Sequence, residues 1–143
     1  MATFMKNINM IYQSGALFRE RKLEKEGICG WHTKYILAVC GSEGVSQEAL
    51  ARQLFVDKSN VARQIARLEE MGYVRREQSQ TDRRAFNVYS TESGKELYKK
   101  IKQVNAEWRN LLTENFTEEE REQLWRLTDK LYTNARAIME SEQ

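Results

Sequence analysis

The chain has 143 residues, of which 41% are hydrophobic and 31% are charged, and its formal net charge is +2 at pH 7. This composition is typical of one folded domain and excludes a disordered chain, and no apolar run approaches the ~20 residues of a membrane helix. There is no proline, which favours long helices, and the two cysteines, Cys29 and Cys40, are too few for a disulfide framework or a four-thiolate metal site.

The N-terminal segment predicts a helix and not a secretion signal. Residues 1–13 lack the basic start and apolar core of a signal peptide, so we expect a cytoplasmic protein. Over residues 4–26, apolar side chains follow the three–four spacing of an amphipathic helix, at Ile8, Ile11, Tyr12 and Phe18. An apolar face so near a terminus needs a partner, either in its own domain or on a second chain.

Glycines then predict a break and a second helix. Gly27 and Gly30 bracket the break, and the next helix is expected from Trp31 to Val39 or Cys40. The sequence Gly-Ser-Glu-Gly over residues 41–44 is typical of a turn and ends this helix.

Residues 45–72 predict two helices joined by a tight turn. Ser46 is placed to cap a third helix, and its core side is expected at Leu50, Ala51 and Leu54. Asp57 is placed to cap a fourth helix over residues 58–71, and Gly72 would end it. The apolar side of the fourth helix carries Val61, Ile65, Leu68 and Met71.

Two strands and a polar loop follow. The sequence from Tyr73 to Arg76 begins a strand, and residues 85–90 alternate apolar and polar side chains as a returning strand does. The connection over residues 77–84 is long for a simple hairpin turn and carries Arg83 and Arg84 near its end. This pattern indicates a projecting wing.

The C-terminal third predicts two long helices. Thr91 would cap a fifth helix over residues 92–112, with an apolar stripe at Leu97, Ile101, Val104, Trp108 and Leu111. Thr117 and Glu120 match a capping box at the start of a sixth helix. The apolar stripe of the sixth helix consists of Leu124, Leu127, Leu131, Ala135 and Ile138.

The order helix, turn, helix, strand, basic loop, strand indicates a winged helix-turn-helix that binds DNA. The major groove accepts one α-helix, in which Arg can grip guanine and Asn or Gln can grip adenine. Asn60, Arg63 and Gln64 supply these groups near the start of the fourth helix. The helix starts at Ser46, Gln47, Lys58 and Ser59 suit phosphate contacts, and Arg83 and Arg84 could enter a minor groove or clamp its phosphates. A polar helix face alone is more often only a solvated surface.

The central stretch resembles the MarR family of bacterial transcriptional regulators. The matching text is SQEALARQLFVDKSNVARQIARLEEMGYVRR, followed by TDRRAFNVYSTESGKEL. Its most specific features are the wing motif Asp82-Arg83-Arg84 and the strand-to-helix junction Ser90-Thr91-x-x-Gly94. The resemblance covers residues 30–100 well, whereas the outer helices agree in pattern and order only.

The resemblance implies a homodimer that binds a palindromic operator as a repressor. It implies a single mainly α domain over residues 1–143, with a winged unit at about 30–100 and interlocking dimerisation helices at 1–28 and 101–143. Half-site centres would lie about one helical turn, ~10 bp, apart. The DNA-binding residues implied by motif and helix face are Ser46, Gln47, Lys58, Ser59, Asn60, Arg63, Gln64, Arg67, Asp82, Arg83 and Arg84.

Many regulators of this type release DNA when a small aromatic or phenolic ligand binds beside the dimerisation helices. Trp31, His32, Tyr35 and Trp108 are the candidate effector residues. The competing interpretation places Tyr35 and Trp108 in the core and His32 on the surface.

A thiol-based redox sensor of the same fold is an alternative. Cys29 lies at a predicted helix start, where the helix dipole could favour a thiolate, whereas Cys40 is expected to be buried at a helix end. No basic cluster lies beside either residue, so buried or incidental cysteines are the competing interpretation. One histidine and two separated cysteines make poor zinc ligands, and no cofactor is expected.

An enzyme and a protein-interaction module are the other function classes. The sequence has no nucleophile at motif spacing from its single histidine and no glycine-rich phosphate loop, which argues against an enzyme. A protein interface would carry aromatic or aliphatic anchors on the face around Arg63, and none occur there.

Overall fold

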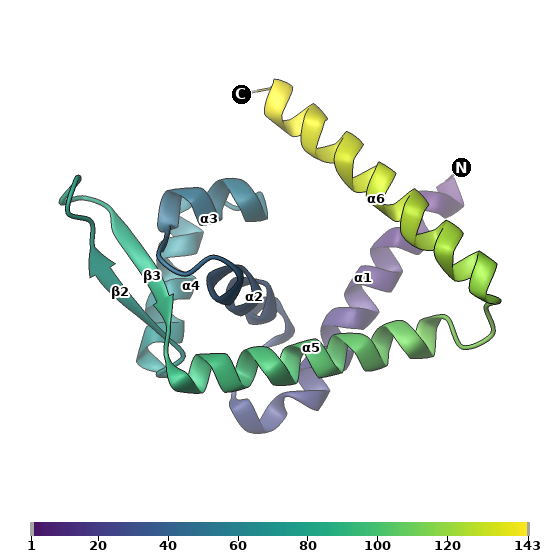
Figure 1. Ribbon diagram of the computed structural model, residues 1–143, viewed down its shortest axis with the longest axis horizontal. Helices are drawn as coiled ribbons and strands as arrows, with labels where there is room; N and C mark the ends of the chain where they lie inside the picture. Colours follow the sequence, from purple (N-terminus) through teal and green to yellow (C-terminus); the bar gives the residue numbers. More distant parts are fainter. Residues whose placement is uncertain (1, 143) are drawn as a thin grey trace. The chain divides into compact units, whose positions relative to one another are not determined.

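Residues 2–142, which the computed structural model describes, are mainly helical with one small sheet (Figure 1). Met1 and Gln143, the outermost residues of the predicted domain, lie outside the described range. In chain order the elements are α1 (Ala2–Lys22), η1 (Glu24–Glu26), η2 (Gly30–His32), α2 (Thr33–Gly41), β1 (Val45–Ser46), α3 (Gln47–Leu54), α4 (Lys58–Glu70), β2 (Val74–Gln78), β3 (Phe86–Ser90), α5 (Glu92–Leu112) and α6 (Glu118–Ser141).

The chain divides into two compact units, Met1–Trp108 and Arg109–Gln143. The first contains every element from α1 to β3 and most of α5, and the second contains the end of α5 and all of α6. No helix within the described residues is both long and apolar enough to cross a membrane.

Side-chain caps set the helix-turn-helix of the first unit. The Ser46 hydroxyl accepts a hydrogen bond from the Ala49 amide at 3.0 Å and starts α3, and the Asp57 carboxylate accepts one from the Asn60 amide at 2.8 Å and starts α4. Phe55 adopts a left-handed φ of 54° between them and ends α3. Gly72, with φ of 84°, lies just beyond α4, as the sequence predicts.

The sheet has one strand more than the sequence predicts. Its order is β1-β3-β2, and all pairs are antiparallel. β1 has only two residues and pairs Val45 with Val88, so it is too short for an alternating pattern to be visible. β2 runs on to Gln78, which pairs with Phe86, so the wing loop begins later than predicted.

One apolar core joins the elements of the winged unit. Its fully buried side chains come from α2, α3, α4, the sheet and α5, and include Ile36, Leu50, Ile65, Val88 and Ile101. The predicted three–four stripes of α4 and α5 supply Val61, Leu68 and Leu97 to this core. α4 is therefore held by burial of one face while its opposite face stays in solvent.

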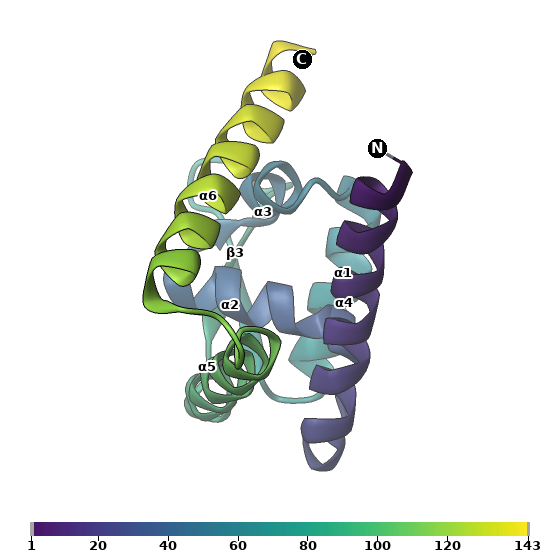
Figure 2. The same cartoon turned by 90° about the vertical axis from the view of Figure 1, so that its right-hand side faces the viewer.

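α1 is shorter than the sequence predicts. It ends at Lys22, after which Leu23 is buried and Glu24–Glu26 form a separate turn closed by Gly27 at φ of 71°. α1 lies at the end of the winged unit opposite the hairpin (Figures 1 and 2) and contacts η2. At that contact a Cβ on Gly30 would overlap the Ala16 carbonyl, so glycine permits the close approach.

The junction from β3 to α5 is tied to the end of α4. The Thr91 hydroxyl donates to the Gly72 carbonyl at 2.6 Å and accepts from the Gly94 amide at 3.0 Å, which confirms Thr91 as the cap. A Cβ on Gly94 would overlap the Tyr73 carbonyl oxygen. The motif Ser90-Thr91-x-x-Gly94 thus locks α5 onto the hairpin.

α6 has no buried residue, although its predicted capping box is present. The Thr117 hydroxyl accepts from the Glu120 amide at 3.2 Å, and the Thr117 amide donates to the Glu120 carboxylate at 2.8 Å. The exposed apolar side chains of α6 are Trp125, Leu127, Leu131, Tyr132, Ile138 and Met139. α1 likewise exposes Phe4, Met5, Ile8, Met10, Ile11 and Tyr12.

Candidate nucleic-acid interface

The solvent face of α4 is basic and polar. Arg63 and Arg67 are exposed and Asn60 is half-buried, whereas Val61, Ile65 and Leu68 are fully buried on the opposite side. Neither Arg63 nor Arg67 forms an ion pair with any carboxylate of residues 2–142, so both guanidinium groups keep their donors available. Each of these two guanidinium groups can therefore donate hydrogen bonds to a guanine or a phosphate.

The first turn of α4 is partly committed to its own cap. The Ser59 hydroxyl donates to Asp57 at 2.6 Å, and Lys58 pairs with Glu48 of α3 at 3.2 Å. The hydrogen bond from Ser59 is the largest cause that lowers the pKa of Asp57, and the Asn60 amide and Arg63 act in the same direction. Asp57 is therefore a carboxylate at neutral pH and keeps the helix start in place.

Gln64 differs from the other predicted contacts because its amide is engaged inside the protein. The Gln64 Oε1 atom lies 2.9 Å from Nε2 of His32, and His32 is only 4% exposed. The expectation that His32 lies on the surface is wrong, because η2 turns its ring inward against α4. Burial is the largest cause and lowers the pKa of His32, the hydrogen bond with Gln64 raises it in part, and the charge of Arg67 lowers it further.

The wing loop is folded by its own polar groups. The Asp82 carboxylate accepts from the Arg84 amide at 3.0 Å, and the Gln78 side chain donates to the Arg83 carbonyl at 2.6 Å. These bonds hold the backbone of the loop, whereas the side chains of Arg83 and Arg84 are exposed. Neither guanidinium pairs with a carboxylate in the part of the chain that the structure describes.

Predicted residues from three elements meet where the wing approaches α3. A pocket of about 290 Å³ is lined by Gln47, Glu48, Lys58, Asp82, Arg84, Ala85 and Phe86. The Gln47 Oε1 atom is buried and has no hydrogen-bond partner within residues 2–142. The structure thus brings together Gln47, Lys58 and Arg84, which lie far apart in the sequence.

Two carboxylates that no sequence motif marks brace the hairpin. Glu69 of α4 accepts from the Arg76 amide at 2.7 Å and pairs with the Arg76 guanidinium at 3.1 Å. Glu43 accepts from the Ser90 amide at 2.9 Å and from the Ser90 hydroxyl. Glu69 therefore links α4 to the wing through a tertiary contact that the sequence pattern does not show.

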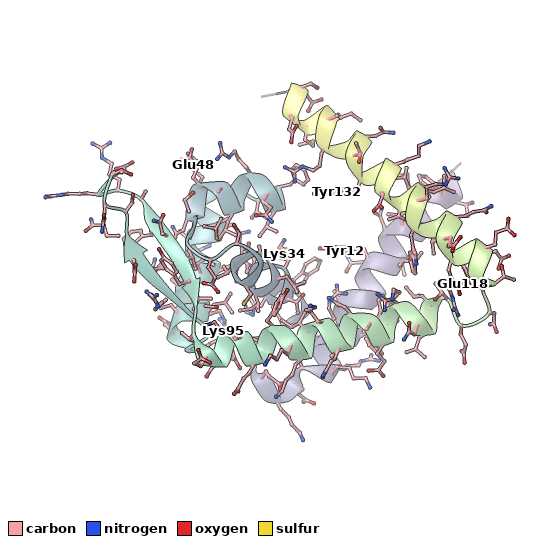
Figure 3. The ribbon with its side chains drawn as sticks, viewed as in Figure 1. Tyr12, Lys34, Glu48, Lys95, Glu118 and Tyr132 are labelled. Carbon is pink, nitrogen blue, oxygen red and sulfur yellow. The ribbon has the colours of Figure 1, made fainter. Side chains whose placement is uncertain are left out.

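The four candidate effector residues lie in different surroundings. Tyr35 is buried in the core, as the competing interpretation expects, and His32 faces α4. Trp31 is exposed and packs on Tyr12, which points from α1 toward α2 (Figure 3), with ring centroids 5.5 Å apart. Trp108 is half-buried and packs on Phe18 at 5.0 Å. Both tryptophans pack on aromatic side chains of α1.

Arg19 is a further residue in this region that the sequence does not reveal. A Cβ on Gly15 would lie 2.9 Å from the Trp108 indole nitrogen and 3.2 Å from the Arg19 guanidinium, so both groups meet over this glycine. The Arg19 Nε atom is buried with no hydrogen-bond partner among residues 2–142. Burial lowers the pKa of Arg19, although the group stays a cation at any physiological pH.

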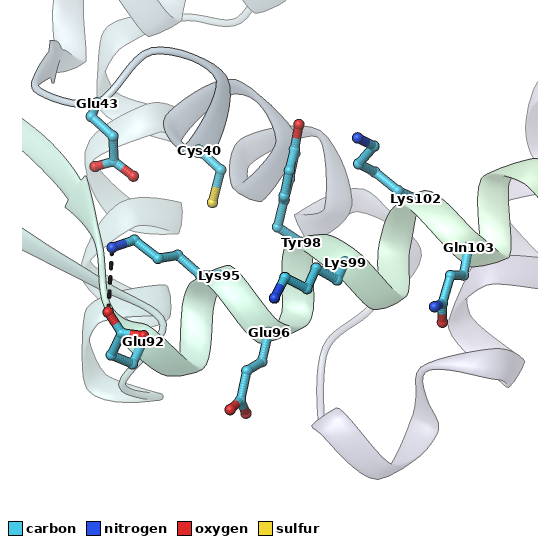
Figure 4. A pocket seen from close by; sticks show the side chains of 9 residues that line it. All are labelled: Cys40, Glu43, Glu92, Lys95, Glu96, Tyr98, Lys99, Lys102 and Gln103. Atoms are coloured by element: carbon cyan, nitrogen blue, oxygen red, sulfur yellow. Dashed lines mark hydrogen bonds and ion pairs between the residues drawn. The ribbon is translucent and has the colours of Figure 1, made fainter.

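Both cysteines are free thiols and half-buried. Cys29 precedes η2, and its amide donates to Nδ1 of His32 at 3.4 Å. Cys40 points toward an open groove of about 780 Å³ between α2 and α5, which Lys95 and Tyr98 also line (Figure 4). Burial raises the pKa of the Cys40 thiol, which disfavours the reactive thiolate.

Comparison with known proteins places this geometry in one family. The family model described as MarR family matches residues 30–85. The HTH-type transcriptional regulator BilQ of Clostridium symbiosum is 27% identical over 129 residues, which is 90% of each chain. A crystal structure of MarR is 30% identical with a TM-score of 0.90, and the match covers 97% of this chain and 94% of that one. The chain belongs to the MarR family.

As a MarR-family protein, the chain is a DNA-binding transcriptional regulator and not an enzyme. A MarR-family structure from Listeria monocytogenes, solved in complex with a 26mer DNA, has the same fold. It is 22% identical, has a TM-score of 0.84, and the match covers 93% of this chain and 89% of that one.

Proposed function

We propose that this MarR-family protein is a cytoplasmic repressor that acts as a homodimer on a palindromic operator. Each copy would place the exposed face of α4 in a major groove and its wing along the neighbouring minor groove or phosphates. In this proposal the chain acts as one domain, with the winged unit at about residues 30–100. The DNA contacts would come from the predicted DNA-binding residues between Ser46 and Arg84, with Asp82 shaping the wing.

The observation that carries this proposal is the set of four unpaired arginines. Arg63 and Arg67 on α4 and Arg83 and Arg84 on the wing are exposed, and none has a carboxylate partner among residues 2–142. The other arginines of the hairpin are paired, Arg75 with Glu77 and Arg76 with Glu69. Free guanidinium groups on two projecting elements suit recognition of base edges and phosphates.

The homodimer is supported by the apolar faces of α1 and α6. Six apolar side chains of α6 are between 41% and 58% exposed, and no residue of that helix is buried. Isolated helices with such faces are unstable in water, so each requires a covering surface. A second copy of the chain supplies matching faces.

The experiment that tests the proposal is selection of bound sequences from randomised duplex DNA at near-physiological salt. A palindrome with half-site centres about 10 bp apart is the expected result for a dimeric reader. Weak, salt-sensitive binding without a motif would contradict it. It would favour the alternative of a winged helix that serves a protein partner.

A small aromatic effector is supported by the groups gathered on α1. Trp31 and Tyr12 offer ring faces, and Arg19 and the Trp108 indole offer hydrogen-bond donors around Gly15. A ring that carries an acidic or phenolic oxygen would match this chemistry. Release of the selected operator by such compounds, and loss of that release in Arg19→Met, would support the assignment.

A further inference from the structure

The single histidine of the chain links two elements of the winged unit. It lies at the end of η2, where the missing side chain of Gly30 lets the backbone touch α1. Its ring is buried and contacts the amide of Gln64 on α4, which belongs to the predicted DNA-reading set. The ring therefore connects η2, which contacts α1, to the Gln64 amide on α4.

The surroundings of the ring determine its protonation state. Nδ1 faces the amide of Cys29 at 3.4 Å, and a backbone N–H can only donate. Nδ1 must therefore be the acceptor, and the neutral ring carries its proton on Nε2. The Nε2 atom then donates to Gln64, 2.9 Å away, and only the amide oxygen can accept.

We propose that His32 is a positioning residue for base reading, which holds the Gln64 amide with its oxygen turned inward and its NH₂ group left for DNA. This inference rests on the proposed DNA-reading role of α4. A free glutamine grips adenine with its oxygen and nitrogen together. Held in this way, Gln64 is a donor only, and it favours guanine, whose major-groove edge offers two acceptors, over adenine.

Because the chain has one histidine, the hydrogen bond can be observed by itself. Long-range proton–nitrogen NMR spectra of the imidazole ring distinguish the two tautomers in the DNA-free protein. We expect the Nε2–H form in the wild type, and a shifted Nε2 resonance in Gln64→Ala. The Nδ1–H form, or an Nε2 resonance that does not respond to Gln64→Ala, would overturn the proposal.

Two substitutions of His32 distinguish the hydrogen bond to Gln64 from the contribution of the buried ring to packing. His32→Asn keeps an acceptor near the position of Nδ1 and loses the donor to Gln64. His32→Gln keeps a donor near the position of Nε2. Both remove the aromatic ring, so a purely structural role predicts equal effects, and a thermal-unfolding scan of each variant shows whether it is folded.

The readout is base preference measured by selection from randomised duplex DNA. At the position whose preference changes in Gln64→Ala, His32→Asn should raise the share of adenine relative to guanine about fivefold, the value of one lost hydrogen bond. His32→Gln should retain the wild-type preference. In the Gln64→Ala background, His32→Asn should have no further effect on that position.

Two results from the variants would overturn the reading role by itself. One is an equal change of preference in His32→Asn and His32→Gln, and the other is a Gln64→Ala variant whose preference matches wild type at every position. A wild-type protein that selects no motif would overturn the proposed function and the reading role together, whereas the NMR result still reports whether the hydrogen bond exists.

Discussion

The guanidinium of Arg63 is the group on α4 best placed to read a base. It is exposed, it lies within the first two turns of the helix, and it has no ion-pair partner among residues 2–142. Arg63→Ala should weaken binding of the selected operator by ~1–3 kcal/mol and relax base preference at one position. Arg21→Ala, an exposed arginine on α1, is the matched control and should leave preference unchanged. If Arg63→Ala bound every sequence as the wild type does, Arg63 would have no base-reading role.

His32 should make folding stability depend on pH near neutrality. Its pKa is lowered from the ordinary value of 6.5, chiefly by burial, so the unfolded chain takes up a proton at a pH where the folded protein does not. Stability should therefore fall as pH drops below about 6.5, until the folded protein is also protonated. Urea denaturation between about pH 5.5 and about pH 7.5 measures this, and His32→Asn should lose the slope. Equal slopes in both proteins would contradict the assignment.

The residues that sequence patterns identified are those with a local signature. Ser46, Asp57 and Thr91 cap helices by contacts within three residues, which a sequence displays directly. The His32–Gln64 contact joins residues 32 positions apart, and nothing in the local sequence indicates it. The burial of His32 was for this reason not predicted.

At the scale of elements, the wing should act mainly through phosphate charge. In its loop, hydrogen bonds with other side chains hold the backbone of Arg83 and Arg84 and leave both arginine side chains exposed. Replacing both with alanine should weaken binding to all DNA sequences. The slope of log K against log salt concentration should become shallower by ~2, because two phosphate contacts are lost. The matched control is Lys99→Ala with Lys102→Ala on α5, which removes the same charge from exposed positions away from the interface. An equal change of slope in the control would show an effect of net charge alone.

The junction between the hairpin and α5 should tolerate no side chain at Gly94. A Cβ there overlaps the Tyr73 carbonyl, so Gly94→Ala should lower the free energy of unfolding by ~1–3 kcal/mol. Gly41→Ala is the control, because a Cβ on this last residue of α2 meets nothing within 4 Å. It should be neutral or more stable by up to ~1 kcal/mol. Chemical denaturation compares the two, and equal stability would remove the steric argument for the motif.

The order of the helices from α2 to α6 was predictable because α3, α4, α5 and α6 each carry a side-chain cap and an apolar period, and a glycine-rich turn ends α2. The bounds of α5 and the start of α6 agree with the sequence within a residue. β1 was not predicted because a strand of two residues is too short to show an alternating pattern, and its formation depends on pairing with Val88. The bracing of the wing by Glu69 likewise depends on tertiary contact.

At the scale of the whole molecule, assembly should depend on the apolar face of α6. Leu131 lies on the stripe that also carries Leu127 and Ile138, and it is 47% exposed in one chain. Leu131→Asp would place a charge in the buried centre of a dimer interface, which costs several kcal/mol without a partner charge. We expect sedimentation to show a dimer for the wild type and a monomer for Leu131→Asp over micromolar concentrations.

Thr133→Asp is the matched control for this prediction, because it adds the same charge two residues along the same helix. Two residues correspond to about 200° around a helix, so Thr133 lies opposite the stripe. The control should remain a dimer. Because a palindrome is read by two copies at once, loss of the dimer should also reduce operator affinity far more than loss of one base contact. If Leu131→Asp stays dimeric, the dimer interface does not depend on this face of α6. Substitutions on the exposed apolar face of α1 would then test the alternative interface.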